Sequence, residues 1–400
     1  MSHRTPLLTP WQPLHVSIVT ETYPPEINGV ALTVARWVQG LRRRGFQVDL
    51  VCVRQNADSP LAANDAPDNL HLPGFRIPGY PQLQAGWPNG RVLLAQWRQK
   101  RPDLVHIVTE GPLGYSALRA ARRLSIPIST SFHTNFQQYS RHYRLGWLAA
   151  PITGYLRHFH NQGVQTLAPT QQLADELRSL GFQRIQVLAR GVDTTLFTPT
   201  RRDLMLRQHW GVAPKALAVA YVGRLAAEKN LELGIAAFQA IRQVRPDARL
   251  ILVGDGPLAE RLRARHPGFV YCGMRQGEDL AAHYASADLF LFPSLTETFG
   301  NVVLEAMASG LPVVAFDYAA AHTHVQSGHS GLLAPFGDAE TFIAAATQLI
   351  RNPDRLAAMG QAARHAALQV DGEPIYDRLA ALLLRAARGA NPCLSTLHAT

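Results

Sequence analysis

Two cationic side chains lie close together where an expected strand gives way to an expected helix, in the stretch Gly223-Arg224-Leu225-Ala226-Ala227-Glu228-Lys229-Asn230. Arg224 follows the end of the strand, and Lys229 stands at the entrance of the helix. Two cations beside free backbone N–H groups suit a diphosphate, which carries about two negative charges. On spacing alone a solvated loop is the commoner explanation. Because Lys229 is one of only three lysines in the chain, phosphate binding gains some weight.

A second group of candidate residues runs from Glu297 to Glu305. Glu297 is expected in a loop after a strand, and the N–H groups of residues 299–301 are expected to open a helix that contains Glu305. A loop carboxylate beside helix N-terminal amides can hold a sugar hydroxyl and a phosphate together, and a deeper carboxylate suits a vicinal diol such as ribose. Two Glu residues at this spacing are more often plain helix surface.

Apolar runs of strand length alternate with segments of helical period, which predicts an α/β fold built from βαβ units around parallel sheets. Residues 55–90 are rich in Pro, Gly and Asn and are expected to form loops. Strands are expected over 15–20, 47–53, 104–108 and 128–132, and then over 217–222, 249–253, 269–272, 289–292 and 312–315. Helices are expected over 30–44, 202–209, 231–244, 258–265, 278–285, 301–309 and 375–388.

This order predicts two doubly wound, Rossmann-like domains that face each other across a cleft, with ligands beyond the carboxyl ends of the strands. The first domain spans 1–198 and the second spans 199–370. A helix over 371–388 is expected to pack back on the first domain, and 389–400 are expected to form a disordered tail.

The charge is distributed unevenly. The 400 residues include 39 Lys and Arg against 29 Asp and Glu, and 17% of them are charged. Residues 1–200 hold 20 basic and 11 acidic side chains, whereas 201–400 hold 19 and 18. A basic half suggests an acidic partner such as phosphate, nucleic acid or anionic lipid. Composition bias is the rival explanation, since 36 of the 39 basic residues are Arg.

Cysteine usage and the apolar segments bear on the compartment. Cys52, Cys272 and Cys393 have no paired spacing, so a disulfide framework and a Cys-based zinc site are not expected. No signal-peptide pattern is present at the start, and the apolar run 145–156 is too short for a bilayer, which needs about 20 residues. A cytoplasmic protein is expected, with peripheral contact at the inner face of the membrane as a further interpretation.

Taken together, these passages closely resemble the retaining GT-B glycosyltransferases of the glycogen-synthase-like, family-four group. The resemblance runs from residue 16 to about residue 336, in the family's order. A single Gly-Asp-Gly turn would be a weak match, whereas all the motifs at consistent separations are a strong one. The matching residues are Asn28-Gly29-Val30, His133, Gly191-Val192-Asp193, Phe197, Pro199, Gly223-Arg224, Lys229, Gly254-Asp255-Gly256-Pro257, Pro293-Ser294, 297–305 and Ala308-Ser309-Gly310-Leu311-Pro312-Val313.

The resemblance implies a nucleotide-sugar site. Arg224 and Lys229 would hold the diphosphate, and Glu305 would bind the ribose. Gly29 would let a loop of the first domain approach the phosphate, because a side chain there would obstruct it.

The same likeness implies the groups around the donor sugar. Glu297 would bind its hydroxyls, helped by the amides of Phe299, Gly300 and Asn301, and His133 would face the sugar from the first domain. By itself, a His after an apolar strand is more often a structural residue. The base contact is expected from the backbone around 273–275.

The implied mechanism is front-face displacement with retention of configuration. Arg224, Lys229 and the helix amides would stabilise the departing diphosphate, whose oxygen would take the proton of the acceptor. The chain has no Asp-x-Asp metal motif, and the two cations could replace a divalent ion. No cofactor and no metal are therefore expected.

Donor and acceptor are suggested by a narrower likeness. Residues 20–30 and 132–136 are similar to GDP-mannose-dependent α-mannosyltransferases and to glycolipid synthases that use UDP-sugars, including sulfoquinovosyl transferases. GDP-mannose is favoured over UDP-glucose or a related UDP-sugar, and the expected acceptor is a lipid or a lipid-linked glycan. The apolar run 145–156, flanked by Arg141, Arg144 and Arg157 and by aromatic residues, suits shallow insertion at an anionic membrane surface. A buried helix between sheet and surface fits equally well.

Three other classes of protein share some features with this sequence. A dehydrogenase would need a Gly-x-Gly-x-x-Gly turn after its first strand, which 21–29 do not supply. No recognisable nucleic-acid-binding motif accompanies the basic half, so no nucleic-acid partner is expected. A sugar-nucleotide epimerase or a phosphorylase would share the GT-B architecture.

Overall fold

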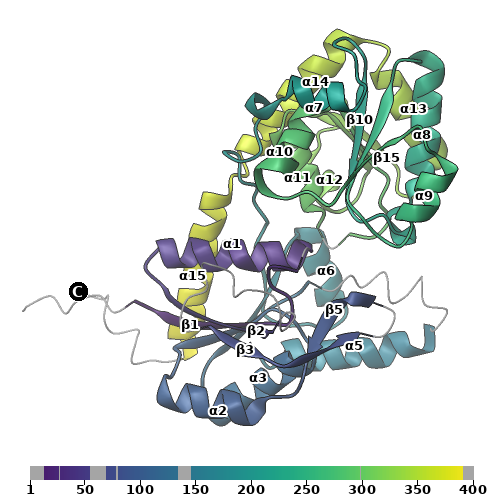
Figure 1. The fold of residues 1–400 in the computed structure, drawn as a ribbon. Helices are drawn as coiled ribbons and strands as arrows, with labels where there is room; N and C mark the ends of the chain where they lie inside the picture. Colours follow the sequence, from purple (N-terminus) through teal and green to yellow (C-terminus); the bar gives the residue numbers. More distant parts are fainter. Residues whose placement is uncertain are drawn as a thin grey trace, which may run out of the picture.

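The computed structural model describes residues 13–26, 28–54, 69–77, 80–133, 146–297 and 299–390. Within these residues the chain forms two parallel sheets, each flanked by helices, and a small antiparallel hairpin (Figure 1). The predicted α/β class and the pair of doubly wound sheets are confirmed.

The first sheet has the strand order β3-β2-β1-β6-β7-β8-β9, and its described pairings are all parallel. β1 lies between β2 and β6, so that Val16 pairs with Val48 on one side and with Leu104 on the other. Strands buried on both faces read as continuous apolar runs, which is why β1 and β2 were predictable to the residue. The strands are β1 (His15–Thr20), β2 (Gln47–Val53), β3 (Leu70–Leu72), β6 (Leu104–Ile107), β7 (Ile128–Ser131), β8 (Gln165–Ala168) and β9 (Ile185–Val187).

Helices cover both faces of this sheet. α1 and α15 enclose the core on one face, with Trp37 and Leu383 among its buried residues, and α2 and α3 enclose the core on the other, with Trp97. These helices, with two further ones, are α1 (Gly29–Arg43), α2 (Gly90–Gln99), α3 (Pro112–Arg123), α5 (Gly146–His160), α6 (Gln171–Ser179) and α15 (Gly372–Ala390).

The expectation of loops throughout 55–90 is wrong for its described part. Besides β3, this stretch forms a hairpin of β4 (Gly74–Ile77) and β5 (Tyr80–Gly86), and α2 begins at its end. The hairpin crosses β2 so closely that a Cβ at Gly74 would lie 2.3 Å from the Val53 side chain. Glycine is needed here for close packing, and its presence suggested a loop.

The second sheet has the order β12-β11-β10-β13-β14-β15, again with parallel pairings. Apolar clusters fill both of its faces. Its strands are β10 (Ala218–Val222), β11 (Arg249–Val253), β12 (Val270–Gly273), β13 (Leu289–Phe292), β14 (Val313–Phe316) and β15 (Gly331–Ala334). The helices of this half are η1 (Pro199–Arg201), α7 (Leu204–His209), η2 (Ala227–Lys229), α8 (Leu231–Val244), α9 (Ala259–Arg265), α10 (Gly277–Ser286), α11 (Asn301–Ala308), α12 (Ala319–His324), α13 (Ala339–Leu349) and α14 (Pro353–Leu368).

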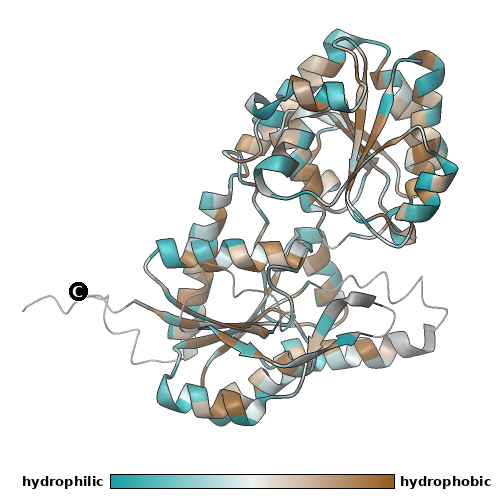
Figure 2. Cartoon of the chain, in the orientation of Figure 1, coloured by the Kyte–Doolittle hydropathy of each residue, from teal (hydrophilic) through white to brown (hydrophobic). Residues whose placement is uncertain are grey.

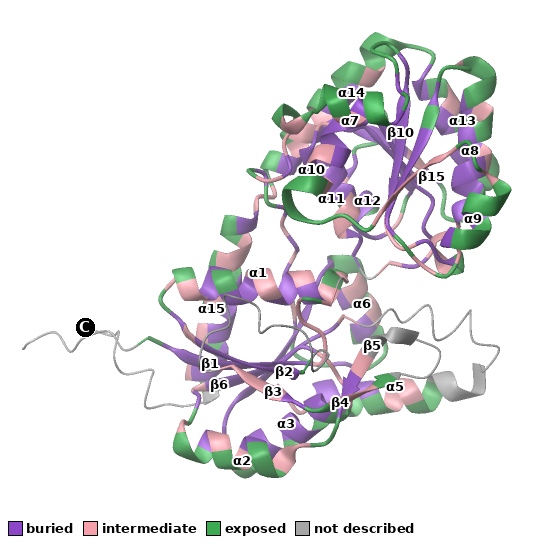
Figure 3. Ribbon diagram, viewed as in Figure 1, coloured by how far each residue is buried: buried purple, intermediate pink, exposed green. Residues whose placement is uncertain are grey.

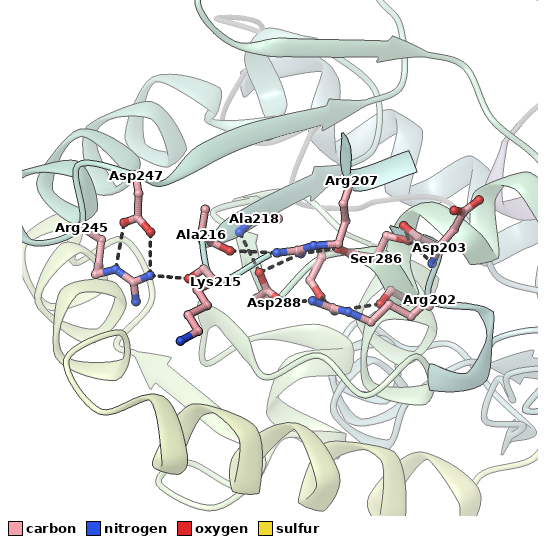
Figure 4. Close-up of polar contacts among 12 residues, drawn as sticks. Arg202, Asp203, Arg207, Lys215, Ala216, Ala218, Arg245, Asp247, Ser286 and Asp288 are labelled. Carbon is pink, nitrogen blue, oxygen red and sulfur yellow. Dashed lines mark hydrogen bonds and ion pairs between the residues drawn. The ribbon is translucent and has the colours of Figure 1, made fainter. Parts of the chain in front are cut away.

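A buried arginine ties the start of this second unit together (Figure 4). Arg207 of α7 is 3% exposed and donates to the backbone oxygens of Ser286 and Ala216 at 2.7 and 2.8 Å. Its charge is matched by Asp288, whose Oδ2 lies 3.0 Å away and also accepts from the Ala218 amide at 2.8 Å. The guanidinium therefore has both a counter-ion and hydrogen-bond acceptors, as a buried structural cation requires.

The chain crosses between the two units twice. Val192 and Asp371 form a parallel bridge, and a Cβ at Gly191 would lie 2.7 Å from the Cα of Gly372. After the second crossing α15 lies along the first unit, where Arg44 donates to Asp377 at 2.7 Å and Arg43 pairs with Glu373 at 2.8 Å. The predicted tail begins too early, because Gly389 and Ala390 still belong to α15; residues 391–400 lie outside the described part.

Hydropathy and burial follow the layers. Apolar residues fill the strands and the inner helix faces, and hydrophilic residues cover the outer faces (Figure 2). The strands of both parallel sheets are largely buried (Figure 3). No helix among the described residues is long and apolar enough to cross a membrane.

Replacement of Gly40 tests the contact between α1 and α15. A Cβ at Gly40 would lie 2.6 Å from the ring of Tyr376, so Gly40→Ala should cost about 1–3 kcal/mol and lower the melting temperature. Gly154→Ala in α5 is the matched control, because nothing lies within 4 Å of its added Cβ and alanine favours a helix. Equal melting temperatures for the two variants in a thermal scan would contradict this packing.

Candidate functional site

The carboxyl ends of the two parallel sheets meet across the boundary between the units. Gly29, the first residue of α1, follows β1, and Asn301, the first residue of α11, follows β13. A Cβ on Gly29 would lie 3.7 Å from the Asn301 side-chain nitrogen. A Cβ at Gly29 would therefore meet no protein atom too closely in this structure. A side chain there would obstruct only a bound ligand. Gly29 and Asn301, two of the expected site residues, lie close together although they belong to different units.

The loop that carries Arg224 is supported by a second tight turn. Leu225 donates its amide to the oxygen of Asp255 at 2.9 Å, and a Cβ at Gly254 would lie 2.0 Å from the oxygen of Gly223. The Gly-Asp-Gly motif thus allows the two strand ends to approach each other. Arg224 is held at the edge of the site, 35% exposed at its side chain and 3.6 Å from Glu228.

Lys229 and Glu297, predicted separately from two motifs, form an ion pair. Lys229 also donates to the backbone oxygen of Thr296 at 3.2 Å, and Ser294 donates to the Glu297 carboxylate at 2.9 Å. The side chains of Lys229 and Glu297 are 18% and 14% exposed. A cation for a phosphate and an acceptor for hydroxyls therefore stand side by side, each with a partner that a ligand could replace.

The N-terminus of α11 opens into the same region. Gly300 is its N-cap in the left-handed conformation, at φ +94°, and as a glycine it supplies no side-chain cap. Glycine fits this conformation at little cost, and it offers no side-chain acceptor to the first amides of the helix. Phe299 is 1% exposed, and Thr298 lies outside the described residues.

Glu305 is more enclosed than a surface helix residue would be. It is 5% exposed, and burial raises the pKa of its carboxyl above the ordinary value. Tyr284 donates to one oxygen at 3.2 Å, and Arg36 of α1 lies 3.7 Å from the other. The carboxylate expected to bind ribose is thus linked to the first unit by a buried contact.

His133 and Arg190 complete the junction. Arg190 follows β9 and donates to Nδ1 of His133 at 2.9 Å. The pKa of His133 lies well below its ordinary value because burial and the Arg190 cation both disfavour a second proton. The imidazole is therefore neutral, and since Nδ1 accepts, its proton is on Nε2.

Arg190 was missed by the sequence analysis, although Gly191-Val192-Asp193 was recognised. A signal was present, because Arg190 directly precedes that motif and follows an expected strand passage. Arg36 was missed as well. Neither contact is visible in the sequence, since His133 and Arg190 are 57 positions apart.

The turn over 273–275, which is expected to contact the base, lies at the end of β12. Gly273 ends β12 at φ +69°, and Arg275 donates to the oxygen of Cys272 at 2.8 Å and pairs with Asp279. A cavity of about 270 Å³ opens beside this turn, between α7 and α10. Arg275 is committed to its own turn, so the backbone groups are the ones available to a base.

Across the described ranges, no group of three or more His, Cys, Asp and Glu side chains is placed to hold a metal ion. The polar groups at the junction are arginines, a lysine, a neutral histidine, helix amides and the carboxylates of Glu297 and Glu305. Such a set suits an anionic, hydroxyl-bearing ligand.

Comparison with known proteins agrees with this geometry. Residues 27–196 match the Glycosyltransferase Family 4 model, and residues 216–352 match the model named Glycosyl transferases group 1. A GDP-mannose-dependent alpha-mannosyltransferase of Mycobacterium tuberculosis is 35% identical, over 82% of this chain and 85% of its own length. The sulfoquinovosyl transferase SQD2 of Arabidopsis thaliana is 30% identical, over 90% and 72%. A GDP-mannose-dependent alpha-(1-6)-phosphatidylinositol dimannoside mannosyltransferase of M. tuberculosis is 33% identical, over 45% and 48%.

A solved structure shows the same fold. Sucrose-phosphate synthase from Thermosynechococcus elongatus superposes with a TM-score of 0.77 at 18% identity, over 92% of this chain and 98% of that one. At this identity the likeness concerns architecture alone, and it confirms the predicted GT-B fold. With the family matches, it decides against the dehydrogenase and nucleic-acid-binding interpretations. The chain belongs to the group 1, family-four glycosyltransferases and is a GT-B enzyme of that family.

Proposed function

We propose that this glycosyltransferase moves mannose from GDP-mannose, with retention of configuration, to a lipid or a lipid-linked glycan. The observation that carries the proposal is the Lys229–Glu297 pair beside Arg224 and the uncapped N-terminus of α11. These groups match the two chemical parts of a nucleotide sugar, the diphosphate and the polyol. The choice of mannose and guanine rests on the relatives named for GDP-mannose.

In the proposed reaction the bond between the anomeric carbon and the diphosphate oxygen breaks. A new bond forms on the same face to the acceptor hydroxyl oxygen, and the acceptor proton passes to the departing diphosphate. Arg224, Lys229 and the α11 amides stabilise the negative charge that develops on the leaving group. His133, neutral with its proton on Nε2, donates a hydrogen bond toward the sugar, and Glu297 accepts from sugar hydroxyls.

We also propose that no metal and no further cofactor take part. The support is the chemistry of the donor set, in which the cations Arg224 and Lys229 supply the positive charge that a divalent ion supplies elsewhere. The enzyme then depends on preorganised cations in a partly enclosed site, where electrostatic contacts are stronger than in water.

A UDP-sugar-dependent glycolipid synthase is the second candidate. It is supported by the likeness to SQD2, which covers 90% of this chain. Both candidates share the diphosphate and sugar contacts and differ in the base and in the sugar. A GT-B epimerase has less support, since these relatives are named as transferases.

Peripheral contact with an anionic membrane, at the inner face of the cytoplasmic membrane, belongs to this proposal. α5 buries Leu156 and Phe159 in the first unit but exposes Tyr155, which is 41% exposed and 6.2 Å from the ring of the 37% exposed Tyr115. Such an aromatic pair suits an interface between water and lipid. Arg157, which flanks the predicted insertion patch, is exposed and donates to the backbone oxygen of Leu180 at 3.1 Å. Arg141 and Arg144, on the other flank, lie outside the described part of the chain.

Donor choice can be tested with purified protein and GDP, UDP and ADP in a thermal-shift assay, followed by transfer from the matching sugar donors. GDP should stabilise the protein most, and transfer from GDP-mannose should give an α-linked product by NMR of the anomeric proton.

The same transfer assay tests metal independence, because activity should persist in a metal chelator. Loss of activity with the chelator would refute metal independence. A β-linked product would refute retention of configuration, and stabilisation by UDP alone would favour the second candidate.

Loss of Lys229 tests the phosphate assignment. Lys229→Ala should lower kcat by about 10²–10³-fold, the typical loss when one group that stabilises developing charge is removed. Lys215→Ala is the matched control, because Lys215 is an exposed lysine of the same unit that precedes β10, whereas Arg224 and Lys229 follow the carboxyl end of that strand. Undiminished turnover in Lys229→Ala would exclude this role.

Membrane contact predicts a surface effect. The double variant Tyr115→Ser/Tyr155→Ser should bind phosphatidylglycerol vesicles several-fold more weakly in a flotation assay, because it loses apolar surface at the interface. The control Leu204→Ser/Met205→Ser removes side chains that are 71% and 72% exposed in the second unit and should bind as wild type. Equal binding by both variants would count against docking through α5.

A further inference from the structure

Arg190 is a buried cation without a buried counter-ion. It is 7% exposed, and among the described residues no carboxylate lies within ion-pair distance of its guanidinium. Arg207 shows the ordinary arrangement, with Asp288 as its counter-ion and backbone oxygens around it (Figure 4). Burying an uncompensated charge is costly, so the position of Arg190 requires a reason that packing does not give.

The contacts of Arg190 use only part of its donor capacity. One terminal nitrogen donates to Nδ1 of His133 at 2.9 Å, and the other makes a long contact of 3.4 Å with the Asn301 side-chain oxygen. Its Nε is buried and has no hydrogen-bond partner among the described residues. Guanidinium has five N–H donors, so most of them remain for another acceptor.

The surroundings compensate the charge only weakly. Burial lowers the pKa of Arg190 to about 10, which leaves it protonated near neutral pH. The Glu297 carboxylate raises that pKa from a distance, but it is already paired with Lys229. The ring of Phe299, 5.5 Å from the guanidinium carbon, adds a cation–π contact worth far less than a counter-ion.

The position of Arg190 points to an anion. One terminal nitrogen lies 3.9 Å from the Cβ position of Gly29, at the N-terminus of α1, and the same nitrogen contacts Asn301, at the N-terminus of α11. Helix N-termini carry partial positive charge. At α1, Val30 and Ala31 already donate to the Asn28 side chain, whereas the N-cap of α11, Gly300, has no side chain to offer. An anionic oxygen at this point would therefore pair with Arg190 and lie near the positive ends of both helices.

We propose that Arg190 is a third cation of the donor site, which binds the anionic oxygens of the distal phosphate and at the same time holds His133 with its proton on Nε2. The inference rests on the proposed function and adds a residue that Arg224 and Lys229 do not replace. Arg190 belongs to the first unit, so the distal phosphate becomes a bridge between the units. The charge that grows on this phosphate during bond cleavage is then stabilised from both sides of the junction.

The same requirement for an anionic oxygen could be met by an acidic group on the donor sugar. The two sources of the anionic oxygen differ in which nucleotides should lose affinity when Arg190 is replaced. A distal phosphate is present in GDP and absent from GMP, whereas an acidic sugar group is present only in a donor such as UDP-glucuronate.

Calorimetric affinities for GDP and GMP test the inference in wild type, Arg190→Lys and Arg190→Gln. Arg190→Gln should bind GDP about tenfold or more weakly, the loss of one charge-assisted contact, and bind GMP within about twofold of wild type. Its kcat with GDP-mannose should fall by about 10²-fold, more than its KM changes, because the contact strengthens as charge develops. Arg190→Lys keeps the positive charge but loses the paired N–H donors of the guanidinium, so its GDP affinity and kcat should lie between those of wild type and Arg190→Gln. Arg265→Gln, an exposed arginine paired with Glu232, is the control and should match wild type.

Each other outcome has a distinct meaning. Equal losses for GDP and GMP, or no loss for either, would overturn the phosphate contact. A loss confined to UDP-glucuronate would move the anion to the sugar and also overturn it. If wild type binds UDP and not GDP, the proposed donor is wrong, and the same comparison with UDP and UMP tests Arg190. If Arg190→Gln does not fold, Arg190→Lys carries the test.

Discussion

Parallel strand direction decides where this molecule can hold a ligand. In each large sheet the described pairings are parallel, so all the carboxyl ends lie along one edge, and the two edges face one another. The residues to which we assign chemical roles in our proposals follow those ends: His133 after β7, Arg190 after β9, Arg224 after β10 and Glu297 after β13. Helices that start at the same edges add their N-terminal amides. The position of the junction thus follows from the sheet topology, and the side chains of Arg190, Arg224 and Lys229 make it cationic.

Sequence patterns predicted the parts of this arrangement that are local. Buried parallel strands appear as apolar runs, so β1 and β2 were predicted with the observed bounds and β13 likewise. The hairpin β4–β5 was not predicted, because its glycines serve a close approach to β2 and not a turn.

The site was predictable to the same local extent. Arg224 and Lys229 lie in one loop and were found together, whereas the pairing of Lys229 with Glu297 joins loops 68 positions apart. The contacts of Arg190 with His133 and of Arg36 with Glu305 are likewise tertiary. No local propensity encodes such contacts, since they depend on which strand ends the sheet order brings together.

The excess of basic side chains in residues 1–200 suggests an acidic partner, and in the structure these side chains serve different purposes. Arg43 and Arg44 hold α15, while Arg190 faces the junction.

The cations at the junction differ in what an anion would change. Lys229 already has Glu297 and Arg224 has Glu228, so an incoming phosphate must compete with an existing carboxylate, and the net gain is a difference between two ion pairs. Arg190 has no such competitor among the described residues, and its burial cost is present before any ligand arrives. An anion bound to Arg190 would offset the free-energy cost of burying its charge and would not have to displace a carboxylate. Unequal partners therefore give the junction a physical division of labour. Under the proposed function, the paired cations would favour exchange of the anion, which product release requires, and Arg190 would favour the state in which both units contact a single anion.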